Sequence, residues 1–182
     1  SNPTAGMLVI GDEILAGRTR DANMHHVAEQ LTEAGIDLVE VRVVSDDAPA
    51  IISAIKALSA AYDTVFTSGG IGPTHDDITA DCIAVAFNDY IDVRDDARAL
   101  LAAHYAKTGS ELNQARLRMA RIPDSAVLID NPVSVAPGFT IQNVHVMAGV
   151  PSVFQAMAAT VLPTLTGGAP LIYRPLRTHR GA

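Results

Sequence analysis

Strand-like and helix-like segments alternate through the first half of the chain, and this alternation restricts the possible folds more than any other feature. Three short runs rich in β-branched and apolar residues have the length of strands: residues 6–10, 38–44 and 64–67. The segments after them carry apolar side chains at the spacing of one helix face: residues 21–35, 45–58 and 78–87. Successive strand–helix–strand units cross over with a right hand and cover both faces of a sheet. The alternation therefore predicts an α/β fold with a mainly parallel sheet.

The second half of the chain departs from this alternation. Residues 95–120 are rich in Ala, Leu and Arg and predict two helices broken near Gly109, inserted over the edge or the active face of the sheet. Three short strands and a closing helix are expected after them, at residues 127–129, 139–142, 144–147 and 152–162. The tail has no periodicity, and we interpret it as a solvated terminus outside the site despite its arginines, Arg174, Arg177 and Arg180.

Length and charge limit the class of protein. The chain has 182 residues, near the usual size of one domain, so we expect residues 1–182 to form a single domain. A net charge of −7 disfavours nucleic acid as a partner, whereas a small phosphorylated ligand can still bind local backbone donors. The one cysteine, Cys82, lies among apolar residues and is expected to be buried and inert, which fits a reducing cytoplasm. No apolar run has membrane-spanning length, so we expect a cytoplasmic protein without a membrane partner.

A glycine-rich loop lies between the strand at 64–67 and the helix at 78–87. Its sequence is Thr67-Ser68-Gly69-Gly70-Ile71-Gly72-Pro73-Thr74-His75-Asp76-Asp77. Loops of this kind follow the carboxyl ends of parallel strands, where ligands collect, and successive glycine N–H groups can converge on an anion. The spacing matches neither a P-loop nor the Rossmann fingerprint. The pattern predicts a phosphate site, and the alternative is a plain turn capped by Asp76 or Asp77.

Two adjacent carboxylates beside a phosphate site repel the ligand unless a partner offsets their charge. A divalent cation such as Mg²⁺ is one such partner, because it binds carboxylates and ligand phosphates together. Alternatively, one aspartate caps the helix and the other accepts hydrogen bonds from pterin N–H groups. A second acidic loop, Gly11 to Gly17, follows the first strand and is expected at the same sheet edge. Its Asp12 and Glu13 are further candidate metal ligands, unless the loop is only a solvated turn with Asp21 capping the next helix.

The longest motifs of these two loops resemble a known family. Gly11-Asp12-Glu13-Ile14-Leu15-Ala16-Gly17 with Asp21-Ala22-Asn23, and the string from Thr67 to Thr79, closely resemble the molybdopterin-binding domain of CinA-like proteins. Later segments resemble the same family: Asn131, Ala136-Pro137-Gly138-Phe139 and Gly149-Val150-Pro151-Ser152. The resemblance extends over about residues 7–165 and implies a three-layer α/β/α sandwich.

The resemblance also implies a function and a site. It implies a domain that binds molybdopterin or a nucleotide and acts as a metal-dependent pyrophosphatase on ADP-ribose or a flavin dinucleotide. It implies ligand contacts at Gly11, Asp12, Ser68, Gly69, Gly70, Ile71, Gly72, Pro73, Thr74, Pro137, Gly138 and Gly149. Catalysis is assigned to Asp76 and Asp77, and the metal to Asp76, Asp77, Asp12 and Glu13.

Two other functions stay open at this point. One is the binding or adenylylation of molybdopterin in molybdenum-cofactor biosynthesis, and the other is a pterin or nucleotide module without catalysis. Because members of the family often form dimers or trimers, the resemblance also implies a homo-oligomer.

Overall fold

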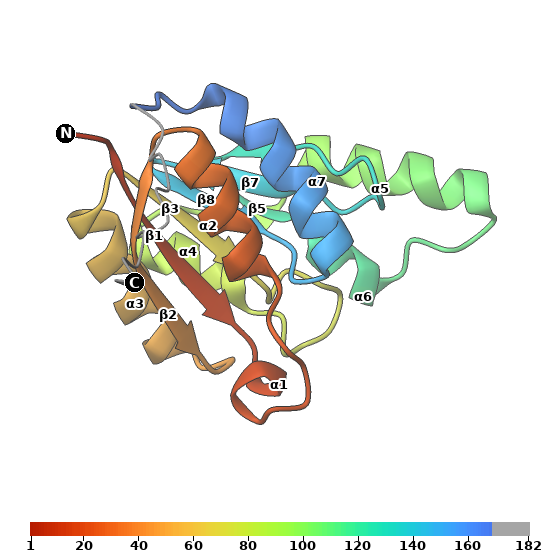
Figure 1. Cartoon of the computed structure of the whole chain (residues 1–182). Helices are drawn as coiled ribbons and strands as arrows, with labels where there is room; N and C mark the ends of the chain where they lie inside the picture. The colour runs from red at the N-terminus through yellow and green to blue at the C-terminus, as the bar shows by residue number, and fades with distance from the viewer. Residues whose placement is uncertain (169–182) are drawn as a thin grey trace, which may run out of the picture.

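The computed structural model describes residues 1–168 and has an α/β fold (Figure 1). The strands are β1 (Thr4–Ile10), β2 (Asp37–Val44), β3 (Thr64–Ser68), β4 (Ile91–Val93), β5 (Arg121–Pro123), β6 (Val127–Ile129), β7 (Gly138–Ile141) and β8 (Val144–Met147). The helices are α1 (Asp12–Leu15), α2 (Asn23–Glu33), α3 (Ala48–Ala61), α4 (Thr79–Ala86), α5 (Asp95–Thr108), α6 (Gln114–Leu117) and α7 (Pro151–Val161). Two short 3₁₀ turns complete the elements, η1 (Arg118–Ala120) and η2 (Leu162–Thr164). The tail arginines lie outside the described residues.

The central sheet has six strands in the order β2-β1-β3-β8-β7-β6. Strands β2, β1, β3 and β8 run parallel to one another, and β7 and β6 continue the sheet as antiparallel neighbours. The prediction of a mainly parallel sheet is therefore confirmed. The carboxyl ends of the parallel strands meet at one edge, and the loops that follow them leave the sheet there.

Helices cover both faces of the sheet, which confirms the three-layer α/β/α sandwich (Figure 1). Alternate residues of β1 show why: Met7 and Val9 pack in one core cluster with α2 and α7, while Leu8 and Ile10 pack in another with α3 and α4. All four side chains are at most 2% exposed. Burying one side chain of this size contributes about 1.5–3 kcal/mol, so the period of two along β1 holds the two outer layers to the sheet.

Three short elements differ from the sequence-based expectation. The sequence predicts a loop at residues 11–17, whereas the structure has one helical turn there, α1. The sequence gives no sign of β4 and β5, which have three residues each and pair antiparallel. A single turn or a three-residue strand is too short to show a periodicity.

The predicted insertion over residues 95–120 is confirmed, and β4 and β5 close its base. Helix α5 ends at Thr108 and is capped by Gly109, which adopts a φ of 70° in the left-handed region; the one-turn helix α6 and the 3₁₀ turn η1 follow. Arg121 of β5 binds Asp81 of α4 at 2.6 Å, which joins the insertion to the sandwich. In Figure 1, α5 projects beyond the sheet, while α6 lies near the end of the sheet that carries α1.

Candidate functional site

One open pocket of about 530 Å³ lies at the carboxyl edge of the parallel strands, and we call it the edge pocket. The loop after β1 contributes Glu13 and Thr19, and the glycine loop contributes Gly69 to Pro73 and Asp77. The remaining walls come from η1, from the loops after β6 and β8 and from the start of α7: Met119, Asn131, Ser134, Ala136, Ala148, Gly149, Val150, Pro151 and Val153. The two loops predicted to share one pocket therefore do so.

The glycine loop lines this pocket, and several of its backbone N–H groups have no hydrogen-bond partner in residues 1–168. The N–H of Gly69 donates to the carbonyl of Met147 at 3.1 Å and is thus occupied. Within the described chain, the N–H groups of Gly70, Ile71 and Gly72 have no hydrogen-bond partner. Three successive free N–H groups form a suitable site for an anion such as a phosphate. The free N–H groups therefore begin at Gly70, because the N–H of the first glycine, Gly69, is already bonded.

Close packing explains why Gly69 and Gly70 are glycines. Both have φ in the left-handed region, at 101° and 75°. A Cβ atom at Gly69 would collide with the carbonyl oxygen of Ile10, and one at Gly70 would collide with Oγ1 of Thr79. Thr79 Oγ1 also donates to the carbonyl of Gly69 at 3.0 Å, which anchors the loop to the start of α4. These glycines are needed for the packing of the loop itself, as well as for any approach of a ligand.

Asp77 lines the edge pocket but does not cap α4. The helix begins at Thr79, and no side chain caps its start. Instead, Oδ2 of Asp77 accepts hydrogen bonds from both the N–H and the hydroxyl of Thr74, each at 2.9 Å. The alternative in which Asp76 or Asp77 caps this helix is therefore wrong. Asp77 Oδ1 has no protein hydrogen-bond partner among the described residues.

Asp76, in contrast, does not line the edge pocket. Its side chain is 75% exposed, and its carboxylate lies 3.5 Å from the ring of His75. The two adjacent aspartates therefore diverge, and only Asp77 is near the free N–H groups.

The loop after β1 meets the loop after β2 through a pair of acids. The N–H of Asp46 donates to Asp12 at 2.9 Å, and the N–H of Asp12 donates to Asp46 at 3.2 Å. Burial raises the pKa of Asp46, and the nearby charges of Asp12, Glu13 and Asp77 raise it further, while its hydrogen bond from Asp12 opposes this. In residues 1–168, no three acidic, histidine or cysteine side chains lie close enough together to hold a metal ion.

Asp46 is an acidic neighbour of the candidate site that the sequence reasoning did not single out. The segment Ser45-Asp46-Asp47 indicates a helix cap, and Asp47 does cap α3 by accepting from the N–H of Ala50 at 3.1 Å. Asp46, however, follows the parallel strand β2, so it too lies at the carboxyl edge of the sheet. Its place after a predicted strand was the available signal.

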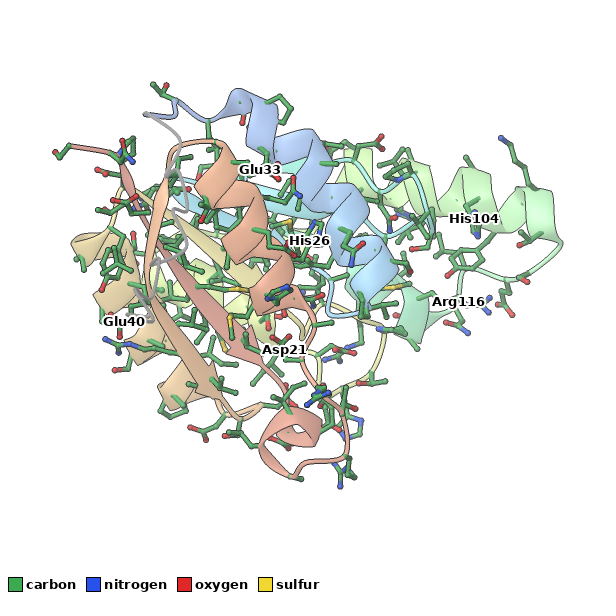
Figure 2. The ribbon with its side chains drawn as sticks, in the orientation of Figure 1. Asp21, His26, Glu33, Glu40, His104 and Arg116 are labelled. Carbon is green, nitrogen blue, oxygen red and sulfur yellow. The ribbon has the colours of Figure 1, made fainter. Side chains whose placement is uncertain are left out.

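Asn23 links three of the loops beneath the edge pocket. It is the first residue of α2 and is only 2% exposed. Its amide donates to the carbonyl of Gly149 at 2.9 Å and to the hydroxyl of Ser68 at 3.3 Å. Asp21, labelled in Figure 2, lies one residue before the N-cap Ala22 and accepts from the N–H groups of Asn23 and Met24 at 3.2 and 3.0 Å.

The remaining sequence-predicted residues lie around the edge pocket rather than in its wall. Ser68 is buried under Asn23, and Gly11 is buried where a Cβ atom would meet the carboxylate of Glu13. Pro137 lines a small neighbouring cavity with Gly70, Ile71 and Gly72, and Thr74 lines a larger one with His75. Gly138 is buried in β7, where a side chain would collide with the carbonyl of Val146.

Asn131 supports the loop after β6. Its Oδ1 accepts from the N–H groups of Val133 and Ser134, and its amide donates to the carbonyl of Ala136 at 2.8 Å. The side chain thus folds this loop against the edge pocket. Cys82 is buried as expected, and burial raises the pKa of its thiol to about 11, which keeps it protonated.

Together, the fold and the edge pocket define an α/β domain with an open pocket at the carboxyl edge of its parallel strands. A family model described as "Probable molybdopterin binding domain" matches residues 6–167. The chain belongs to this molybdopterin-binding domain family, in its CinA-like branch. No helix in residues 1–168 is long and apolar enough to cross a membrane.

Individual relatives agree with this assignment. The chain is 39% identical to a CinA-like protein of Citrifermentans bemidjiense over 88% of its own length and 40% of the relative's. It is 36% identical to a probable FAD synthase of Caenorhabditis elegans over 81% of its own length and 32% of the relative's. The crystal structure of CinA from Thermoplasma acidophilum superposes with a TM-score of 0.81 at 33% identity, covering 88% of this chain and 98% of that one. The chain spans between about a third and two thirds of the length of the curated relatives it matches.

Proposed function

We propose that this domain binds a phosphorylated nucleotide in the edge pocket and cleaves the pyrophosphate bond of ADP-ribose or of a flavin dinucleotide with the help of a divalent cation. The observation that carries the proposal is the row of free N–H groups at Gly70, Ile71 and Gly72 beside the carboxylate of Asp77. The donors bind phosphate oxygens. The probable FAD synthase among the relatives supports a flavin nucleotide as one substrate.

The rest of the edge pocket suits the ring of a nucleotide or a pterin. Ile71, Met119, Val150 and Val153 give it apolar walls, and polar groups such as those of Asn131 and Ser134 lie between them. A pocket of about 530 Å³ is in the size range of small-molecule sites, roughly 300–1,000 Å³. A flat ring can pack on the apolar walls while its phosphate reaches the glycine loop.

Carboxylate oxygens are hard ligands of the kind that Mg²⁺ prefers. Glu13 and Asp77 line the edge pocket, and Asp12 and Asp46 lie beside it. Because Mg²⁺ sites commonly use one or two carboxylates with ligand phosphates and waters, this set fits without a cluster of three. Asp77 and Glu13 would hold the cation, with Asp12 and Asp46 next to them. When bound, the cation would stabilise the negative charge that develops on the phosphate oxygens.

Different protein groups are proposed to contact different parts of the ligand. The N–H groups of Gly70 to Gly72 hold the phosphate, and Thr74 holds Asp77 at the rim through two hydrogen bonds. The carboxylates at the rim would repel the phosphates of a ligand that arrives without a cation. Nucleotide binding is therefore expected to strengthen when Mg²⁺ is added.

The family description supports a second candidate, the binding or adenylylation of molybdopterin. Calorimetry with ADP-ribose, FAD and a molybdopterin ligand, each with and without Mg²⁺, separates the candidates, together with an assay of AMP release. Tight binding and metal-dependent release of AMP from ADP-ribose support the proposal. Binding of molybdopterin alone, or binding without cleavage, would replace it with the second candidate or with a non-catalytic module. The cytoplasmic location and a homo-oligomer of two or three chains stay predictions.

A further inference from the structure

A second open cavity, of about 690 Å³, lies beside the edge pocket. One wall is the tip of the glycine loop, Pro73 to His75, and the other is the inserted segment, Asn113 to Arg116 with Arg118. Pro73 lines both this cavity and the edge pocket, so the two cavities adjoin across one residue.

Arg118 brings an unneutralised positive charge to this junction. Within residues 1–168 it forms no ion pair, and its guanidinium only donates to the carbonyl of His75 at 3.5 Å. By contrast, Arg94 and Arg121 are paired with Asp96 and Asp81 at 2.8 and 2.6 Å. Arg118 also lines the small cavity formed by Gly70, Ile71, Gly72 and Asp77. Its charge is therefore near the free N–H groups and available to a second anion.

Arg116 gives the second cavity a fixed cationic wall. Its guanidinium lies 4.4 Å from the centre of the Tyr105 ring and donates to the carbonyl of Glu111 at 2.6 Å. Figure 2 shows Arg116 at α6, on the side of the molecule from which α5 projects. These contacts hold the side chain in place without neutralising it, since neither partner is an anion. The cavity is thus lined by Arg116 and Arg118 together with Asn113 and Gln114.

We propose that this second cavity, with Arg118 at its entrance, binds the distal half of a dinucleotide pyrophosphate. Arg118 contacts the second phosphate, and the cavity beyond it takes the second ribose or base. The inference rests on the proposed function, because the first phosphate is taken to lie on Gly70 to Gly72. Its consequence is selectivity: a ligand with two phosphates and a distal group binds more tightly than a mononucleotide.

The test compares AMP and ADP-ribose by calorimetry, first without divalent cations and then with Mg²⁺. The proteins are the wild type, Arg118→Ala and a control, Arg98→Ala, which removes an exposed arginine of α5 that lines none of these cavities. We expect the wild type to bind ADP-ribose at least tenfold more tightly than AMP. Arg118→Ala should weaken ADP-ribose binding at least tenfold and AMP binding less than threefold, while Arg98→Ala changes neither.

The outcomes separate this inference from the proposed function. If the wild type binds AMP and ADP-ribose equally and Arg118→Ala changes neither, the second subsite is wrong while nucleotide binding in the edge pocket stands. An equal loss of both ligands in Arg118→Ala also overturns the subsite, because the arginine then acts on the shared phosphate. If the wild type binds neither ligand with or without Mg²⁺, the proposed function fails and the inference fails with it.

Discussion

The side-chain amide of Asn23 donates a hydrogen bond to the carbonyl of Gly149 at 2.9 Å, although the two residues are 126 positions apart. The same amide reaches Ser68, so the start of α2 is bound to the ends of β3 and β8 at once. A Cβ atom at Gly149 would lie 3.2 Å from Cα of Gly69, which shows how closely the two loops approach. The geometry of the edge pocket therefore depends on a residue that is buried beneath it.

Asn23→Ala should loosen this junction. The change removes both hydrogen bonds and leaves the carbonyl of Gly149 without its partner, which typically costs about 1–3 kcal/mol. We expect the free energy of unfolding in urea to fall by about that amount, with weaker nucleotide binding. An alanine at the exposed neighbour Met24 is the control and should change stability by less than about 0.5 kcal/mol. Equal stability of Asn23→Ala and the wild type would contradict this account of the junction.

Gly69→Ala and Gly72→Ala should differ in stability. At Gly69, alanine combines an unfavourable φ of 101° with a collision against the Ile10 carbonyl, a backbone atom that cannot turn away. At Gly72 the neighbour at 2.7 Å is Oδ2 of Asp77, whose side chain can rotate. Strain of the first kind costs of the order of 1–3 kcal/mol, so Gly69→Ala should unfold at clearly lower urea concentration. Similar midpoints for the two variants would show that the glycine loop is not closely packed.

Gly70 is a poor position for testing ligand binding by substitution, because any side chain there collides with Thr79. Valine there would meet Oγ1 of Thr79, so a loss of ligand binding in Gly70→Val would also reflect damage to the loop. Gly72→Ala would mainly displace the carboxylate of Asp77, so it tests the proposed cation ligand rather than the N–H groups.

His145 should make stability depend on pH. It is 6% exposed, packs on Phe66 and bonds to Thr140 at 2.8 Å, and burial lowers its pKa from 6.5 to about 4. In the unfolded chain the ring takes up a proton near pH 6.5, while the folded ring stays neutral until about pH 4. The neutral His145 ring therefore contributes fully to the free energy of unfolding above pH 6.5. This contribution, about 3 kcal/mol in total, is lost as the pH falls from 6.5 to about 4.

Urea unfolding of the wild type and His145→Gln between pH 7.5 and 4 measures this effect. We expect the wild type to lose stability more steeply below pH 6.5 than the variant, which has no titratable ring. Parallel slopes for the two proteins would mean that His145 titrates normally in the folded state.

Much of the fold follows from local patterns in the sequence. Residues 127–129 and 144–147 form strands at the predicted positions, because short apolar runs between turn residues have few alternatives. The end of α5 at Gly109 follows from the left-handed conformation that glycine adopts most readily. The loop after β1 and the glycine loop after β3 lie at the same edge of the sheet simply because these two strands are parallel.

The rest of the site depends on tertiary contacts that leave no local pattern. Asp76 and Asp77 are indistinguishable in the sequence, and only the hydrogen bonds from Thr74 turn Asp77 toward the edge pocket. Arg118 reaches the glycine loop because the pairing of β4 with β5 folds the insertion back on the sandwich. A helical pattern predicts the insertion but not the surface it packs against.

The two aspartates give the most direct test of the central claim, that Asp77 acts on phosphates bound at Gly70 to Gly72. Asp77→Asn keeps an oxygen that can accept from Thr74, so its stability should stay within about 0.5 kcal/mol of the wild type. It loses the charge that a divalent cation requires. Asp76→Asn is the matched control, because this side chain is 75% exposed and outside the pocket wall.

The measurement is the release of AMP from ADP-ribose across a range of Mg²⁺ concentrations for the wild type, Asp77→Asn and Asp76→Asn. We predict metal-dependent cleavage by the wild type, a loss of at least tenfold in Asp77→Asn, and activity within twofold of the wild type in Asp76→Asn. The same response to Mg²⁺ in all three proteins, or no cleavage by the wild type, would contradict the account.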